Sequence, residues 1–133
     1  MQKLAVTAGR VLLGLYFLVP GLSKITGYAA TLDYMLLHEV PLAAILLPVT
    51  ILLQVGGGIF LTTGYRLAQT ALMLAGLTLL INLGMHDFWN NYEGTDSGHE
   101  LQNFIKNLAI LAGLLVLSGS QQVEQFRLFS VKD

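Results

Sequence analysis

Four polar side chains lie inside long apolar stretches of this sequence, one in each stretch. They are Arg10, Gln54, Asn82 and Lys106. A charged or amide side chain is costly to place in lipid, so an apolar segment that keeps one commonly uses it for helix packing or for function. These four residues are therefore the first candidates for a working face.

A second set of reactive side chains gathers where the apolar stretches meet polar sequence. Imidazole and ammonium groups can polarise a carbonyl or exchange a proton, and neighbouring aromatic rings can hold a flat molecule. We expect one cofactor-binding pocket, formed by His86, Phe88, Trp89, Lys106, Asn107 and Lys24. The alternative roles are structural. Trp89 then anchors the interface, His86 is a solvated loop residue, and Lys106 snorkels or pairs with an acidic neighbour.

Arg10 and Gln54 are expected to form an inner polar pair. At ~1.5 Å per residue, Arg10 lies about 9 Å and Gln54 about 13 Å from the same end of their helices, so their side chains can meet. Gln54 offers only a neutral carbonyl to the guanidinium. A structural contact, snorkelling of Arg10 and binding of an external anion all stay open.

The composition indicates which elements position these side chains. The chain has 133 residues, of which 54% are hydrophobic and 11% charged, and a single small soluble core cannot bury that much apolar surface. Residues 4–22, 41–63, 67–85 and 104–118 approach the ~17 to 25 residues of a membrane-spanning helix. A signal peptide is the alternative for 4–22, although this run exceeds the ~7 to 15 apolar residues of a signal. The predicted fold is an all-α, four-helix integral membrane bundle.

Each predicted helix carries one face of polar or small residues. Helical spacing aligns Arg10, Gly14, Phe17, Gly21 and Lys24 on the first span. The same spacing aligns Thr50, Gln54, Gly57 and Gly58 on the second, Thr78, Asn82, His86 and Trp89 on the third, and Asn103, Lys106, Asn107 and Ile110 on the fourth. Such faces should point inward, where glycines allow close packing.

The connections divide by charge and length. Lys3, Arg66 and Lys132 lie on one side, whereas residues 86–102 carry four acidic residues and no Lys or Arg, so both termini are predicted to be cytoplasmic.

The first connection, residues 23–40, is too long for a turn and predicts a short interfacial helix. Pro41 is expected to open the second span and Pro48 to bend it. Residues 86–102 are expected to form an exposed polar loop. We assign 1–120 to one membrane domain and 121–133 to a short cytoplasmic tail at the membrane surface.

Several function classes are disfavoured by the composition. The net charge of −1 provides no basic surface for nucleic acid. The absence of cysteine excludes disulfides, iron–sulfur clusters and covalent haem within this chain, so any electron transfer needs a partner or a diffusible cofactor. The three histidines show no metal-binding spacing, and no metal site is predicted.

Four segments together resemble the DoxX family of small four-helix membrane proteins. They are GRVLLGLYFLVPGLSKITG, QVGGGIFLTTGYR, HDFW and FIKNLAILAGLLVLSG, in that order from Gly9 to Gly119. The resemblance implies functional positions at Arg10, Gly21, Lys24, Gly57, His86, Phe88, Trp89, Lys106 and Asn107. It also implies a location in the bacterial plasma membrane and a link to quinone or oxidative-stress metabolism. Gln54 stands where the family commonly has a glutamate, which removes a titratable partner for Arg10.

Three functions are compatible with these observations. The favoured hypothesis is an accessory subunit in quinone-linked redox or stress metabolism, with a quinone as the candidate cofactor and a redox partner subunit supplying electrons. The second is a non-catalytic membrane scaffold whose polar faces only hold the bundle together. The third is a small-solute transporter or lipid-binding protein, whose cavity a homo-oligomer could enlarge, although no inverted repeat is evident.

Overall fold

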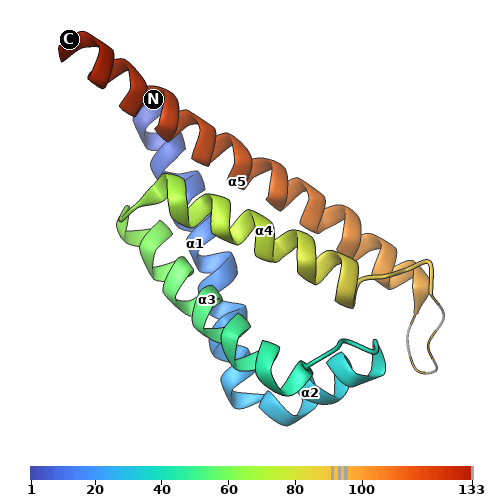
Figure 1. Ribbon diagram of the computed structural model, residues 1–133. Coiled ribbons are helices and arrows are strands. Elements are labelled where there is room, and N and C mark those ends of the chain that lie inside the picture. The colour runs from blue at the N-terminus through green and yellow to red at the C-terminus, as the bar shows by residue number, and fades with distance from the viewer. Residues whose placement is uncertain (91, 93, 95, 133) are drawn as a thin grey trace.

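The computed structural model is entirely helical over the residues that it describes, which are 1–90, 92, 94 and 96–132, with side chains up to residue 121. Its helices are α1 (Gln2–Thr26), α2 (Tyr28–Leu37), α3 (Ala43–Thr63), α4 (Leu67–Met85) and α5 (Ser97–Lys132) (Figure 1). All except α2 are long and apolar enough to cross a membrane. The predicted all-α membrane bundle, with a short helix between the first two spans, is confirmed.

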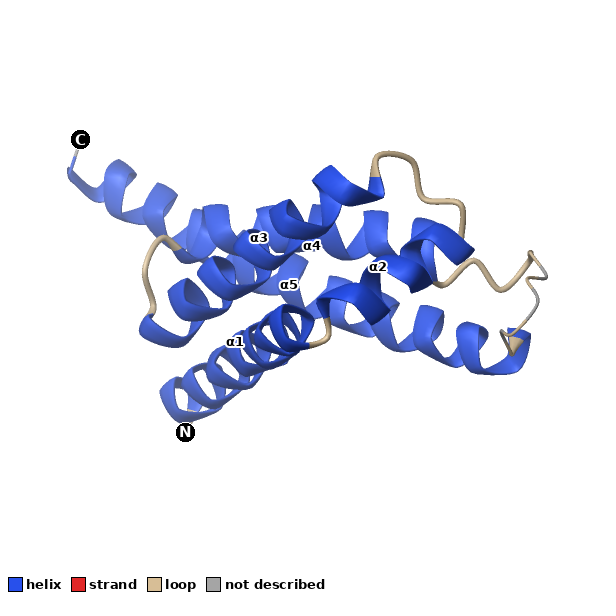
Figure 2. Ribbon diagram, turned by 90° about the horizontal axis from the view of Figure 1, so that it is seen from below, coloured by secondary structure: helices blue, strands red, loops and turns tan. Residues whose placement is uncertain are grey.

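The four long helices form two antiparallel pairs. α1 packs along α3, α4 packs along α5, and a tight turn joins α3 to α4. Both chain termini lie at one end of the bundle, here called the terminal end (Figure 1). α2 and the α4–α5 connection lie at the opposite end, here called the loop end, as Figure 2 also shows. Side chains from both pairs therefore meet at the loop end.

Glycines allow α1 and α3 to approach closely. A Cβ atom built on Gly58 would lie 2.7 Å from the backbone nitrogen of Leu18 and 2.8 Å from the carbonyl oxygen of Gly14. A Cβ atom on Gly14 would in turn lie 2.9 Å from the carbonyl oxygen of Gly58. Because these neighbours are backbone atoms, no rotamer change could make room for a larger residue. The small-residue faces predicted for the first two spans therefore form this contact.

Apolar side chains fill the centre of the bundle. Phe17, Leu61, Leu74 and Leu114, one from each long helix, are fully buried in one cluster. A smaller cluster of Met35, Ala43 and Leu47 packs α2 against α3 at the loop end. Many other large apolar side chains on the long helices, such as Leu12, Leu52 and Leu80, are exposed, as expected where lipid is the solvent. The inward faces predicted from spacing are confirmed for α1, whose buried residues are Gly14, Phe17 and Gly21.

Some boundaries differ from the sequence predictions. α3 begins at Ala43, not at Pro41, because Leu42 has a left-handed backbone conformation, with φ of 55°, that ends the preceding connection. α5 begins at Ser97, where the Asp96 carboxylate accepts a hydrogen bond from the backbone N–H of Gly98 and caps the helix. α5 then continues through most of the predicted tail to Lys132. The connection expected to be an exposed polar loop is thus shorter than 86–102.

Candidate functional site

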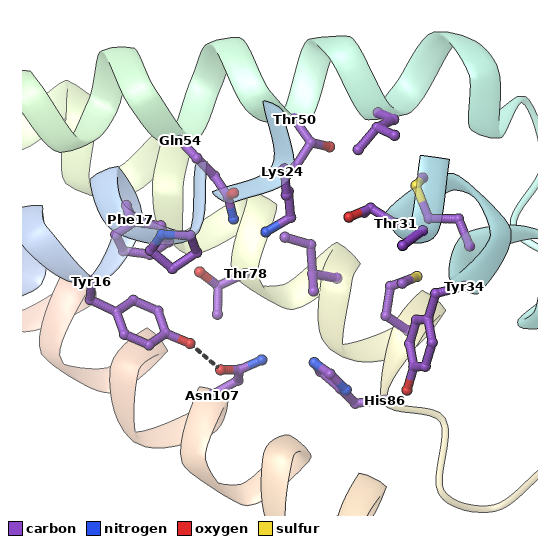
Figure 3. Close-up of a pocket in the computed structure, with 16 residues that line it drawn as sticks. Tyr16, Phe17, Lys24, Thr31, Tyr34, Thr50, Gln54, Thr78, His86 and Asn107 are labelled. Carbon is purple, nitrogen blue, oxygen red and sulfur yellow. Dashed lines mark hydrogen bonds between the residues drawn. The ribbon is translucent and has the colours of Figure 1, made fainter. Parts of the chain in front are cut away.

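A cavity of about 410 Å³ lies at the loop end, between the two helix pairs (Figure 3). This volume lies within the ~300 to 1,000 Å³ of typical small-molecule sites. Every helix contributes to its wall. The lining residues are Tyr16, Phe17, Pro20, Lys24, Ala30, Thr31, Tyr34, Met35, Leu47, Thr50, Gln54, Thr78, Ile81, Met85, His86 and Asn107. The wall is thus mostly apolar, with polar groups converging from α1, α2, α3, α4 and α5 and from His86, just after α4.

Lys24 and Gln54 bring unpaired polar groups to this cavity. Lys24 is half-buried near the end of α1, and no carboxylate pairs with it among the residues that the structure describes. Gln54 is 5% exposed, and its Oε1 atom is buried without a hydrogen-bond donor. A buried polar group without a partner lowers stability unless something else satisfies it. The two side chains therefore present a cation and an amide to whatever occupies the cavity (Figure 3).

Tyr16 and Asn107 join α1 to α5 across the cavity. The Tyr16 hydroxyl donates a hydrogen bond to Asn107 Oδ1 at 2.7 Å. Asn107 is 4% exposed, so this bond satisfies an acceptor that water does not reach freely. The Asn107 Nδ2 group has no protein acceptor among the described residues and stays available as a donor. Asn82, deeper in the bundle, instead donates to the Phe104 carbonyl at 3.0 Å and does not line the cavity.

A buried carboxylate behind the wall near α2 contacts two cavity residues. His86 Nδ1 lies 2.9 Å from Glu100 Oε2, and the Tyr34 hydroxyl donates a hydrogen bond to Glu100 Oε1. Glu100 is only 4% exposed, at the first turn of α5. Burial, followed by the hydrogen bond to Glu100 and its charge, raises the pKa of Tyr34 well above its ordinary value. Tyr34 is therefore a neutral donor at physiological pH.

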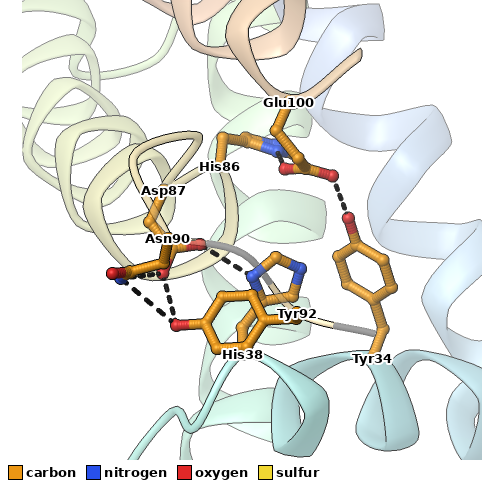
Figure 4. A network of polar contacts seen from close by, with 7 residues as sticks. All are labelled: Tyr34, His38, His86, Asp87, Asn90, Tyr92 and Glu100. Carbon is orange, nitrogen blue, oxygen red and sulfur yellow. Dashed lines mark hydrogen bonds and ion pairs between the residues drawn. The ribbon is translucent and has the colours of Figure 1, made fainter. Parts of the chain in front are cut away.

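A second polar network lies beside the first (Figure 4). His38 Nδ1 is 2.7 Å from Asp87 Oδ1, and both residues are 4% exposed. Asp87 Oδ2 accepts hydrogen bonds from Asn90 at 3.0 Å and from Tyr92 at 2.7 Å. Burial by itself raises the pKa of Asp87, but the hydrogen bonds from Asn90, Tyr92 and His38 outweigh it, so the pKa lies below its ordinary value. The hydrogen bonds of this network connect the end of α2 to the connection after α4.

The structure brings together half of the predicted cofactor pocket. Lys24, His86 and Asn107 line the cavity. Lys106 is exposed and points away, because consecutive helical residues are about 100° apart and Asn107 occupies the inward position. The proposed pairing of Lys106 with Asp87 or Glu100 is likewise not made, since histidines hold both carboxylates.

Phe88 and Trp89 lie outside the cavity wall as well. They pack with Phe104 in a small aromatic group, with ring centroids 5.3 Å apart for Phe88 and Trp89 and 5.3 Å apart for Phe88 and Phe104. Trp89 is 53% exposed. This placement fits an anchor at the membrane interface, the alternative that the sequence left open. The Phe and Tyr rings that do line the cavity are those of Tyr16, Phe17 and Tyr34.

Arg10 and Gln54 do not form the expected inner pair. The Arg10 guanidinium lies against Gly64, where a built Cβ atom would be 2.3 Å from Nη1, whereas Gln54 lies beside Gly21. Gly21 is eleven residues after Arg10, about 16 Å along the helix. The expectation that Arg10 and Gln54 lie at similar depths was wrong. The Gly14–Gly58 contact fixes the axial position of α1 against α3, and it places Arg10 level with the end of α3.

The site also contains residues that were not predicted from the sequence, namely Tyr16, Tyr34 and Glu100. Tyr16 immediately precedes Phe17 on the predicted inward face, and its hydroxyl within an apolar span was an available signal. No local pattern distinguishes Tyr34 or Glu100, since their contact joins positions 66 residues apart. Among the described residues, no three His, Asp or Glu side chains gather in a way that could hold a metal ion.

Comparisons with known proteins agree with this architecture. The fold and the cavity define a small helical membrane protein with an internal, mostly apolar cavity that a few polar groups enter. The DoxX family model matches residues 5–87, and the chain belongs to the DoxX family.

Two proteins of Escherichia coli K12 are similar to this chain. Inner membrane protein YqjF is 39% identical over 118 residues, which cover 89% of this chain and 85% of that protein. Inner membrane protein YphA is 25% identical over 109 residues, which cover 82% of this chain and 77% of that protein. No solved structure matches the chain significantly. With four helices long and apolar enough to span a bilayer, the chain is an integral membrane protein; the cytoplasmic placement of its termini stays a prediction.

Proposed function

We propose that this protein binds a lipophilic molecule with an oxygen-bearing polar head in the loop-end cavity, and that the ligand is a quinone. The observation that carries the proposal is the half-buried Lys24, which has no carboxylate partner among the described residues and lines a cavity of about 410 Å³ inside the bundle. An unpaired ammonium in a mostly apolar wall favours a ligand that supplies a carbonyl or anionic oxygen.

The other cavity groups fit both redox forms of a quinone. Asn107 Nδ2 is a second available donor for a carbonyl oxygen. The orphan acceptor Gln54 Oε1 suits a hydroxyl, which the reduced form would provide. Phe17, Ile81 and other apolar lining residues can enclose the ring. When bound, a quinone would supply two-electron redox chemistry.

The same proposal makes the protein an accessory subunit in quinone-linked redox metabolism. The chain has no cysteine to carry electrons, so a redox partner subunit or a diffusible donor would have to supply them. Native mass spectrometry of the gently extracted protein would report a retained quinone, a partner subunit or a second copy of the chain.

Binding of a short-tailed ubiquinone analogue to the purified protein tests the ligand site. Lys24→Met should weaken binding about tenfold or more, because a hydrogen bond to a charged group contributes about 1.5 to 3 kcal/mol. Lys106→Met is the matched control: it also removes a lysine from a spanning helix, but from an exposed position outside the cavity. It should bind like the wild type. Equal losses in both variants, or no saturable binding by the wild type, would contradict the proposal.

A further inference from the structure

A carboxylate–imidazole pair adjoins the cavity, in addition to the ligand contacts proposed above. His86 and Tyr34 line the cavity, whereas Glu100 does not and is 4% exposed behind them. One carboxylate oxygen of Glu100 contacts His86 Nδ1 at 2.9 Å, and the other accepts the Tyr34 hydroxyl hydrogen. Figure 4 shows Glu100 between the two side chains. A single buried carboxylate thus holds two cavity residues, one from α2 and one following α4.

These contacts determine which ring nitrogen of His86 a ligand can reach. An ionised carboxylate only accepts hydrogen bonds, so Nδ1 must carry the hydrogen that points to Glu100. Nε2 is then the ring nitrogen left for the cavity. In the neutral imidazole, Nε2 accepts a hydrogen bond from a hydroxyl, and in the imidazolium it donates one to a carbonyl.

We propose that His86 Nε2 is a specificity-determining contact for the polar head of the ligand, and that Glu100 is the positioning residue that presents it. The neutral side chain selects a hydroxyl head and the protonated side chain selects a carbonyl head. This inference rests on the proposed function, since it concerns the same cavity. It adds that ligand preference changes with pH.

Among the described residues, few titratable groups surround His86. Glu100 of α5 holds Nδ1, Tyr34 of α2 contacts the same carboxylate, and Lys24 of α1 lies across the cavity. α3 contributes only neutral polar groups, from Thr50 and Gln54. Asp87, next in the chain, is engaged with His38. The His86 ring is therefore the imidazole that faces the cavity from this network.

Binding measured at a series of pH values between about 8 and about 5.5 tests the inference. The wild type should bind the oxidised ubiquinone analogue about tenfold more tightly at the lower pH, because a charged donor has replaced an acceptor. The reduced analogue should show the opposite preference. His86→Gln should bind the oxidised form with little pH dependence. His99→Gln, which removes an exposed histidine of α5 outside the cavity, should keep the wild-type profile.

The Glu100→Gln variant tests whether Glu100 positions the His86 ring or has only a structural role. Its amide can donate a hydrogen bond to Nδ1 and move the imidazole hydrogen to Nε2. At the higher pH this variant should therefore bind the oxidised analogue more tightly than the wild type does, because a neutral N–H donor has replaced an acceptor. Loss of binding at every pH in a folded Glu100→Gln protein would contradict the inference.

A spectroscopic measurement decides the same question without any ligand. Nitrogen-15 NMR of the histidine-labelled wild type should find the hydrogen of neutral His86 on Nδ1, with His38 and His99 assigned by substitution. A hydrogen on Nε2 in the wild type would overturn the inference and leave the ligand site intact. If the wild type binds no ubiquinone analogue, the proposed function fails, and the NMR result still decides whether Glu100 orients His86.

Discussion

The imidazole of His38, just after α2, lies 2.7 Å from the Asp87 carboxylate, just after α4. These residues are 49 positions apart, and their contact joins the two halves of the molecule at the loop end. Both side chains are buried, and the His38 and Tyr92 rings stack edge to face with centroids 4.9 Å apart. The contact keeps α2 beside the cavity that it lines.

Asp87→Asn should destabilise the protein in a pH-dependent way. The hydrogen bonds to Asp87 lower its pKa in the folded protein below the ordinary value, despite the opposing effect of burial. A group of this kind contributes stability above its unfolded pKa of about 3.9 and loses it as the pH falls through the folded pKa. The variant should lose about 1.5 to 3 kcal/mol near neutral pH.

Thermal unfolding in detergent at several pH values checks this prediction. The difference between wild type and Asp87→Asn should be largest near neutrality and should shrink below about pH 4. Asp33→Asn, at an exposed site on α2, provides a control that should leave the pH dependence unchanged. A constant difference across the range would count against the assigned role of the Asp87 charge.

Gly58→Ala should weaken the packing of α1 against α3. The new methyl group would lie 2.7 Å from the Leu18 backbone nitrogen, so the helices themselves must separate. Overpacking of this kind costs about 1 to 3 kcal/mol. The matched control is Gly56→Ala on the same helix, where nothing lies within 4 Å of the added atom. Unfolding of both variants in the same detergent should show a loss only for Gly58→Ala, and equal behaviour would contradict the close crossing.

Gly64→Ala should combine backbone strain with displacement of Arg10. Gly64 has a φ of 87°, a left-handed value that costs other residues about 1 to 2 kcal/mol, and a Cβ atom there would lie 2.3 Å from Arg10 Nη1. Gly94→Ala isolates the strain, because Gly94 has a φ of 88° with nothing within 4 Å. Gly64→Ala should therefore destabilise the protein more than Gly94→Ala does.

A double-mutant cycle tests the Arg10 contribution to that difference. In an Arg10→Ala background the guanidinium is gone, so Gly64→Ala should cost less than it does in the wild type. The free energies of unfolding of the four proteins give the coupling directly. If the losses in unfolding free energy of the two single variants add up to that of the double variant, the Arg10 side chain moves aside without cost.

Tyr16→Phe should destabilise the protein by about 0.5 to 1.5 kcal/mol, because it leaves Asn107 Oδ1 without its 2.7 Å donor at a buried position. Tyr28→Phe is a suitable control, since Tyr28 is 38% exposed and its hydroxyl has no hydrogen-bond partner among the described residues. Thermal unfolding measures both losses. If Tyr28→Phe costs as much as Tyr16→Phe, the bond across the cavity contributes nothing specific.

The sequence was sufficient to predict the spanning helices and the inward face of α1. Apolar runs of membrane length require helices, because lipid leaves every backbone N–H and C=O group to be satisfied within the segment. The helical repeat then fixes which residues share a face. This is why Gly14, Phe17 and Gly21 were predicted inward from spacing and are the buried residues of α1.

Only the tertiary structure decided how the helices are set against one another and which polar groups meet. The Gly14–Gly58 contact places Arg10 beside Gly64. The axial offset between α1 and α3 cannot be obtained by counting residues along either helix alone. The burial of Asp87 and Glu100 depends on α2 folding back against the α4–α5 connection, through contacts between distant positions. Periodicity determines the direction of a side chain around its own helix, whereas a site depends on the axial positions of several helices, which their mutual packing sets.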